Sequence, residues 1–172
     1  MKTQPQKSIS SGLRLLFGFL TAAFLVSHAV PAAAQGANAE KIKEALKVMK
    51  EEAGKLGEPK MERSTLFFGT TKMNGNYTIV DSLKTRFNCV ATFFSKKGTD
   101  YVRVSTNVLN EGDRAVGTVL DPKGAAYAAI SKGESFSGTV DILGKKYESG
   151  YEPIKNAAGE TVGVYFVGFM AE

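Results

Sequence analysis

Apolar residues recur every three or four positions over residues 39–55, and this spacing predicts an amphipathic helix there. The recurring positions are Ile42, Ala45, Leu46, Met49, Ala53 and Leu56. Asn38 stands where a helix cap is expected, and Gly54 and Pro59 end the pattern. Lys and Glu occupy the opposite face, so we expect the apolar face to pack against the rest of the domain.

From residue 64 onward, short apolar segments alternate with turn residues, which is typical of an antiparallel sheet. The predicted strands are Ser64–Gly69, Val90–Ser95, Asp100–Asn107, Ser135–Ile142, Lys146–Pro153 and Thr161–Phe169. Two shorter helices are expected at Ile79–Phe87 and Gly124–Ser131. Asp121 is placed to cap the second of these, with Pro122 at its first helical position. The order of elements predicts an α+β fold.

The first 34 residues have the pattern of a removable export signal. Basic residues precede an apolar run over residues 15–30, and three alanines then offer a cleavage site after Ala34, with Ala39 as the alternative. An uncleaved membrane anchor is the competing interpretation, because the run is near the shortest length that spans a bilayer. We therefore expect residues 1–34 to be a signal peptide and the remaining chain to be periplasmic.

Composition excludes several kinds of chemistry from residues 35–172. The only histidine, His28, lies in the signal, and Cys89 is the only cysteine. With no histidine and a single cysteine, residues 35–172 contain no Ser-His-Asp or Cys-His pair, no His-ligated zinc and no intrachain disulfide. Basic residues number 19 against 17 acidic ones and are scattered, so nucleic acid is not an expected partner. We predict no enzymatic activity, no cofactor and no metal.

Arg103 is the first candidate for binding chemistry. Alternation along Asp100–Asn107 predicts that Tyr101, Arg103 and Ser105 share one face of a strand, while two valines occupy the other. If the valines face the helix, the guanidinium points to solvent or into a pocket. With the hydroxyls of Ser105 and Thr106 beside it, Arg103 suits a carboxylate, since the fork matches two oxygens.

A second candidate group contains phenols. Tyr127, Tyr147 and Tyr151 supply apolar area with a polar tip, as a small-molecule pocket requires. Tyr151 shares a strand face with Ser149 and Tyr147, which favours pocket lining for Tyr151 and Ser149. For Tyr147, packing against the sheet is an equally good interpretation.

The strand segments resemble those of bacterial single Cache domains, which are PAS-like extracytoplasmic sensor modules of chemoreceptors and histidine kinases. The resemblance covers residues 58–168, and it is carried by the ordered segments Asp100–Asn107, Arg114–Thr118, Gly144–Tyr147, Tyr151–Ile154 and Gly163–Gly168. It implies a sheet of five or six antiparallel strands behind a long N-terminal helix, with a ligand pocket on the opposite face. The implied organisation is a signal at 1–34, the helix within 35–57 and a single Cache domain over 58–172.

The resemblance also indicates which positions matter. In related citrate- and dicarboxylate-sensing kinases, an Arg-x-Ser-His strand end is similar to the segment from Arg103 to Thr106, and an Arg-x-Lys-x-Pro strand is similar to the segment from Ser149 to Pro153. Arg103 thereby inherits the anchor role. Ser149 and Tyr151 replace the two cations of the second strand, which points to a smaller or less charged ligand, such as a monocarboxylate or an amino acid.

We therefore expect a ligand-binding sensor for signal transduction or chemotaxis, with no output module of its own. Its partners would be a small organic ligand and a membrane chemoreceptor or histidine kinase. The alternative is a non-catalytic module whose pocket has degenerated and whose N-terminal helix forms a homodimer or binds a receptor. An enzyme of unfamiliar type is a third hypothesis, disfavoured by the absence of histidine.

Overall fold

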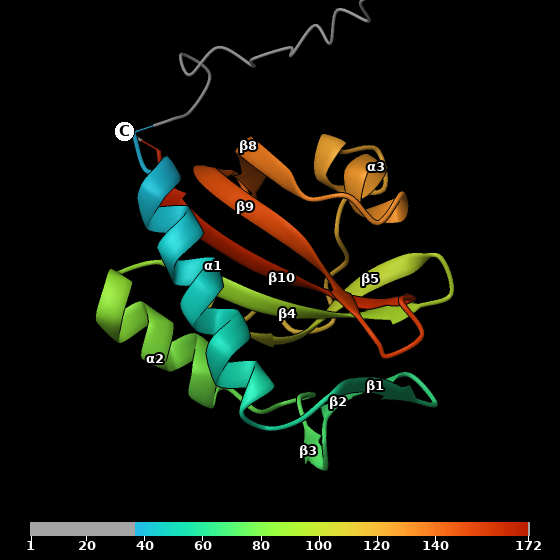
Figure 1. The fold of residues 1–172 in the computed structure, drawn as a ribbon. Helices are drawn as coiled ribbons and strands as arrows, with labels where there is room; N and C mark the ends of the chain where they lie inside the picture. Colours follow the sequence, from blue (N-terminus) through green and yellow to red (C-terminus); the bar gives the residue numbers. More distant parts are fainter. Residues whose placement is uncertain (1–36, 172) are drawn as a thin grey trace, which may run out of the picture. The chain divides into compact units, whose positions relative to one another are not determined.

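The computed structural model describes residues 37–171, so the predicted signal at 1–34 lies outside it. Figure 1 shows the arrangement of the helices and strands. They are α1 Ala39–Gly54, β1 Pro59–Glu62, β2 Thr65–Phe68, β3 Thr71–Lys72, α2 Thr78–Phe87, β4 Val90–Lys97, β5 Asp100–Thr106, β6 Leu109–Asn110, β7 Asp113–Arg114, α3 Ala125–Ser131, β8 Phe136–Ile142, β9 Lys145–Lys155 and β10 Thr161–Met170. None of the helices in this part of the chain has both the length and the apolar character needed to cross a bilayer.

The central sheet has five strands in the order β5-β4-β10-β9-β8, and all neighbouring pairs are antiparallel. This confirms the predicted α+β fold, with each predicted strand in place to within two residues. In the turn between β8 and β9, Leu143 and Gly144 have φ values of 52° and 82°, the left-handed conformation that a two-residue hairpin needs. The sheet is therefore built mainly from local hairpins.

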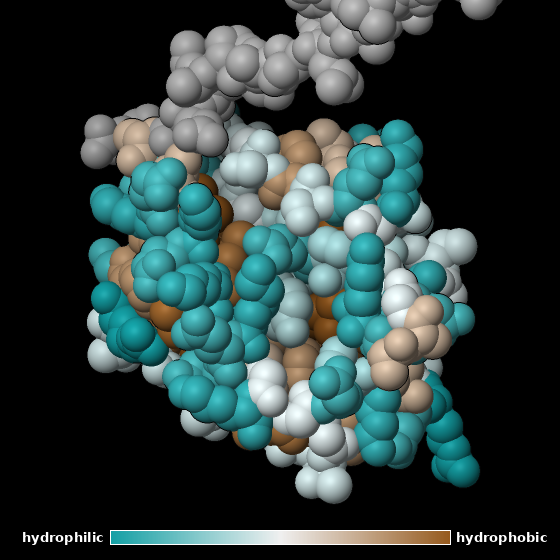
Figure 2. All heavy atoms as spheres, in the orientation of Figure 1, coloured by the Kyte–Doolittle hydropathy of each residue, from teal (hydrophilic) through white to brown (hydrophobic). Residues whose placement is uncertain are grey.

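One face of the sheet is covered by α1 and α2 (Figure 1). The predicted apolar stripe of α1 is buried there, joined by Val48, while Leu56 lies beyond the helix and is partly exposed. The outward face of α1 is hydrophilic in Figure 2. Asn38 occupies the N-cap position as expected, but its side chain makes no capping hydrogen bond, and its backbone N–H donates to Glu148 Oε2 at 2.8 Å. The start of α1 is thus tied to β9.

The opposite face of the sheet carries α3 and a second apolar cluster that includes Phe94, Ile130 and Phe166. The predicted role of Asp121 as a helix cap is wrong, and so is the placement of Pro122 in the first helical turn. The helix begins after Gly124, and Asp121 Oδ1 accepts the N–H of Lys123 at 2.9 Å in a turn that precedes it. The side chain of Asp121 therefore shapes the approach to α3.

Four short strands, β1, β3, β6 and β7, were not predicted. The strand β1 pairs with β2, which pairs with the two-residue β3, and β6 pairs with β7 in a two-residue ribbon. Segments this short contain too few residues to show a period of two. The residues after the ribbon then run along the outer edge of β5, where Arg103 exchanges backbone hydrogen bonds with Thr118 and Gly117 at 2.9 Å each. This pairing covers a strand edge that would otherwise be open.

The contact between β10 and β4 gives a test of the sheet. A Cβ added at Gly163 would overlap the carbonyl oxygen of Phe94. We expect Gly163→Ala to lower the free energy of unfolding by about 2 kcal/mol, because the strands must separate to admit the methyl group. Gly54→Ala is the matched control: a Cβ there meets nothing within 4 Å, so the change should be neutral or stabilising by up to about 1 kcal/mol. Urea unfolding measures both, and equal effects would contradict this account.

Candidate ligand-binding site

An irregularity in β5 decides which of its side chains reach the pocket. Phe94 pairs with Arg103 and Phe93 pairs with Ser105, so Val104 is an extra residue between the two pairs. A β-bulge of this kind moves the following side chains to the other face. Val104 and the partner of Ser105, Phe93, both lie in the cluster under α1 and α2. The prediction that Ser105 shares a face with Arg103 is therefore wrong, and the Ser105 hydroxyl donates to the Asn76 carbonyl at 2.5 Å.

A pocket of about 430 Å³ lies on the α3 side of the sheet, opposite α1. Parts of β5, β8 and β9, the segment that covers β5 and the start of α3 form its wall. The residues that line it are Arg103, Thr118, Val119, Leu120, Asp121, Gly124, Ala125, Ala126, Phe136, Thr139, Val140, Asp141, Ile142, Leu143 and Tyr151. We call it the Arg103 pocket. Its volume falls in the range of ordinary small-molecule sites.

The guanidinium of Arg103 is buried, with 5% of the residue exposed, and not all of its hydrogen-bond donors have a partner. One terminal nitrogen donates to Thr118 Oγ1 at 2.9 Å, and the group lies 5.1 Å from the centre of the Phe94 ring. Its Nε has no hydrogen-bond partner, and within residues 37–171 no carboxylate forms a salt bridge with it. Burial lowers the pKa of Arg103, although the nearby Tyr151 phenol acts in the opposite direction. A buried cation without an anion is costly, so this site is incomplete as it stands.

Tyr151 lines the same pocket from β9, as predicted. Its ring centre lies 4.7 Å from that of Phe166 and 6.0 Å from that of Phe136, so the phenol is held in an aromatic group. Burial raises the pKa of Tyr151 to about 12, partly offset by the positive charge of Arg103. At neutral pH the phenol therefore keeps its proton and serves as a neutral hydrogen-bonding group.

The other predicted site residues do not line the Arg103 pocket. Thr106 Oγ1 lies 2.7 Å from Thr92 Oγ1 and accepts the N–H of Val108 at 3.1 Å, so its hydroxyl joins strands. Ser149 lies on the pocket face of β9, but its hydroxyl donates to the Gly138 carbonyl at 3.0 Å. The Tyr127 hydroxyl donates to the Thr99 carbonyl at 2.8 Å. These hydroxyls bind within the fold, and a ligand role for them stays a prediction.

Sequence reasoning missed Thr118, Phe136 and Val140 as pocket residues. Thr118 holds Arg103 in place and lies in a segment quoted above for its family resemblance, yet nothing in the sequence indicates that this segment runs beside β5. Phe136 and Val140 alternate on the face of β8 that meets Tyr151 and Tyr147, so the period of two could have found them.

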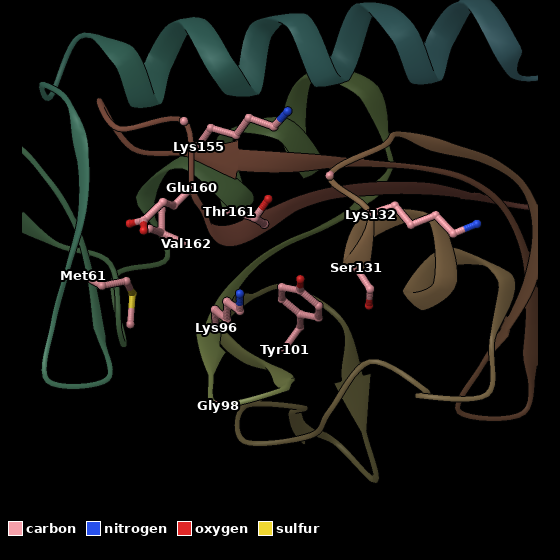
Figure 3. A pocket seen from close by; sticks show the side chains of 12 residues that line it. Met61, Lys96, Gly98, Tyr101, Ser131, Lys132, Lys155, Glu160, Thr161 and Val162 are labelled. Atoms are coloured by element: carbon pink, nitrogen blue, oxygen red, sulfur yellow. The ribbon is translucent and has the colours of Figure 1, made fainter.

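A second hollow of about 620 Å³ opens at the other end of the sheet, where Lys96, Lys132 and Lys155 contribute to its wall (Figure 3). All three lysines are exposed, and Figure 3 shows their ammonium groups spread along the hollow. Exposed ammonium groups are already solvated and need no ligand. The Arg103 pocket is therefore the better candidate. Between residues 37 and 171, no cluster of Asp, Glu, His or Cys could hold a metal ion.

A protein-family model described as the Cache 3/Cache 2 fusion domain matches residues 29–172. Among solved structures, the sensor domain of DcuS from E. coli is similar, with 16% sequence identity, a TM-score of 0.40, and coverage of 80% of this chain and 79% of that one. Curated proteins give no match.

The buried phenol predicts a pH dependence. The pKa of Tyr151 is raised from 10.0 to about 12 on folding, so its contribution to stability is complete below pH 10 and is lost as the pH rises to 12. We expect wild type to lose about 3 kcal/mol more than Tyr151→Phe over that interval. Urea unfolding at pH 9 and pH 12 measures the difference, with Tyr127→Phe as a half-exposed control. Identical losses in wild type and Tyr151→Phe would refute the assignment.

Proposed function

The chain belongs to the Cache 3/Cache 2 fusion domain family, and on this premise we propose that it is a periplasmic sensor that binds a small carboxylate-bearing metabolite in the Arg103 pocket. Cache domains are extracytoplasmic ligand-sensing modules, so the family supplies the general role and leaves the ligand open. A monocarboxylate or an amino acid agrees with Ser149 and Tyr151, which stand where related citrate- and dicarboxylate-sensing kinases have two cations. A membrane chemoreceptor or histidine kinase would receive the signal.

The incomplete guanidinium is the observation that carries this proposal. Arg103 is buried beside a pocket, has one hydrogen bond to Thr118 and leaves its Nε without a partner. A carboxylate that binds the guanidinium would supply both the missing charge and the missing hydrogen bonds. Hydrogen bonds to charged groups contribute about 1.5–3 kcal/mol, whereas micromolar affinity needs about 8 kcal/mol. Apolar contacts with the remaining wall must provide the difference.

The alternative of a degenerate pocket is less well supported. A module that no longer binds a ligand would have no reason to keep a buried cation unpaired, because an apolar residue of similar size is usually at least as stable there. The homodimer through α1 stays a prediction, and the charged outward face of that helix offers no apolar surface for it (Figure 2). Lack of enzymatic activity likewise stays a prediction.

Titration of the purified protein with monocarboxylates and amino acids, followed by calorimetry and thermal shift, tests the proposal. We expect Arg103→Met to weaken binding by about tenfold to a hundredfold, because it removes the hydrogen bonds between the guanidinium and the carboxylate. Arg103→Lys should bind weakly, because a single ammonium keeps the charge and loses the fork. Arg86→Met, a change to an exposed arginine of α2, should leave binding unchanged.

Folding of the variants is checked in the same experiment. Without ligand, Arg103→Met should unfold at the same temperature as wild type or higher, because it removes a buried charge that has no partner. If the variant is as stable as wild type and does not bind, the loss of binding is caused by the change at the site and not by unfolding. If no carboxylate binds wild type, or if Arg103→Met binds as well as wild type, the proposal is wrong.

A further inference from the structure

Eight of the fifteen residues that line the Arg103 pocket have aliphatic or phenyl side chains, and Thr118, Asp121, Thr139 and Asp141 add polar groups beside Arg103 and Tyr151. Leu120 and Ala126 are buried in its wall, and Phe136 and Val140 are partly buried. At the mouth, two large apolar side chains remain unusually open to solvent: Val119 is 50% exposed and Leu143 is 44% exposed. Apolar surface gathered at the entrance of a cavity favours a ligand that covers it. A small acid held only at the guanidinium would leave this wall in contact with water.

Among the residues that line the pocket, Arg103 is the sole cation. The two other charged residues of the lining, Asp121 and Asp141, are both exposed carboxylates. Asp141 Oδ1 accepts the N–H of Gly144 at 2.9 Å, and Asp141 is opposite Lys146 in the β8–β9 register. Asp121 is exposed and its Oδ1 accepts the N–H of Lys123 at 2.9 Å. A second carboxylate would therefore meet no second cation inside the pocket, and an α-ammonium group next to a carboxylate bound by Arg103 would lie close to a like charge.

We propose that the ligand is a monocarboxylate with an unbranched or branched hydrocarbon tail of several carbons, bound with its carboxylate on Arg103 and its tail along Leu120, Phe136 and Val140 toward the mouth. This inference rests on the proposed function and narrows it. It excludes acids as small as acetate, dicarboxylates and amino acids as the natural ligand. The pocket volume of about 430 Å³ admits such a tail.

A matched set of compounds tests the tail and the carboxylate separately. Calorimetry on the purified protein would compare acetate, butanoate and hexanoate with hexanamide, hexanedioate and 2-aminohexanoate. Each buried methylene should tighten binding by up to about fourfold, so hexanoate should bind at least tenfold more tightly than acetate. Hexanamide has the same tail without the charge and should bind at least tenfold more weakly than hexanoate. The dicarboxylate and the amino acid should also bind at least tenfold more weakly.

A variant of the wall supplies a second, independent readout. Val140→Thr keeps the shape of the side chain and adds a hydroxyl, so it should weaken hexanoate about fivefold and leave acetate unchanged. Val116→Thr is the control, because Val116 is exposed and lies outside the pocket lining. If acetate binds as tightly as hexanoate, the proposed role of the hydrocarbon tail is wrong, and the proposed carboxylate site at Arg103 still stands. Hexanamide binding as tightly as hexanoate, or no binding of any acid, would overturn the proposed function itself.

Discussion

The site depends on the extra residue in β5. Because Val104 is unmatched opposite Phe93 and Phe94, the strand divides its polar residues between two faces. Arg103 keeps its place on the face away from α1, and the serine two residues later does not follow it. In a regular strand Ser105 would lie on the same face as Arg103. With the bulge, Thr118 accepts the hydrogen bond of one terminal nitrogen of Arg103, and the Nε has no partner.

The strand end beyond the bulge has become structural. Thr106 is joined to Thr92 on β4, and the buried Asn107 side chain accepts the Ala91 N–H at 2.7 Å and donates to the Val80 carbonyl at 2.6 Å. Asn107 thereby ties β4 to α2 through an amide that has no access to solvent. Buried polar groups that are satisfied in this way fix one arrangement of the elements around them. Polar residues at a strand end can thus bind a ligand or form hydrogen bonds between neighbouring elements, and their sequence pattern is the same in both cases.

Much of the fold could be predicted, because α1 and the strands of the central sheet are long enough to show their periods. The pattern of α1 predicted its buried face, and the alternation of apolar residues predicted β8 and β9 to within two residues. Prediction failed where a single residue changes the register or where a contact is distant in sequence. The bulge at Val104 moves the following side chains of β5 to the other face of the sheet, and nothing in the amino-acid sequence marks it. Thr118 meets Arg103 only because its segment folds back along the edge of β5.

That folded-back segment also links the pocket to the helix layer. Thr118, which holds the guanidinium, lies four residues after Arg114, whose terminal nitrogens bind both oxygens of Asp81 on α2 at 2.8 and 2.9 Å. Arg114 also donates to the Thr106 carbonyl at 2.7 Å and lies 4.2 Å from the centre of the Tyr77 ring. Asp81 and Tyr77 belong to the start of α2, which packs against α1. The floor of the pocket and the helix layer are therefore held by one continuous stretch of chain, from Arg114 to Thr118.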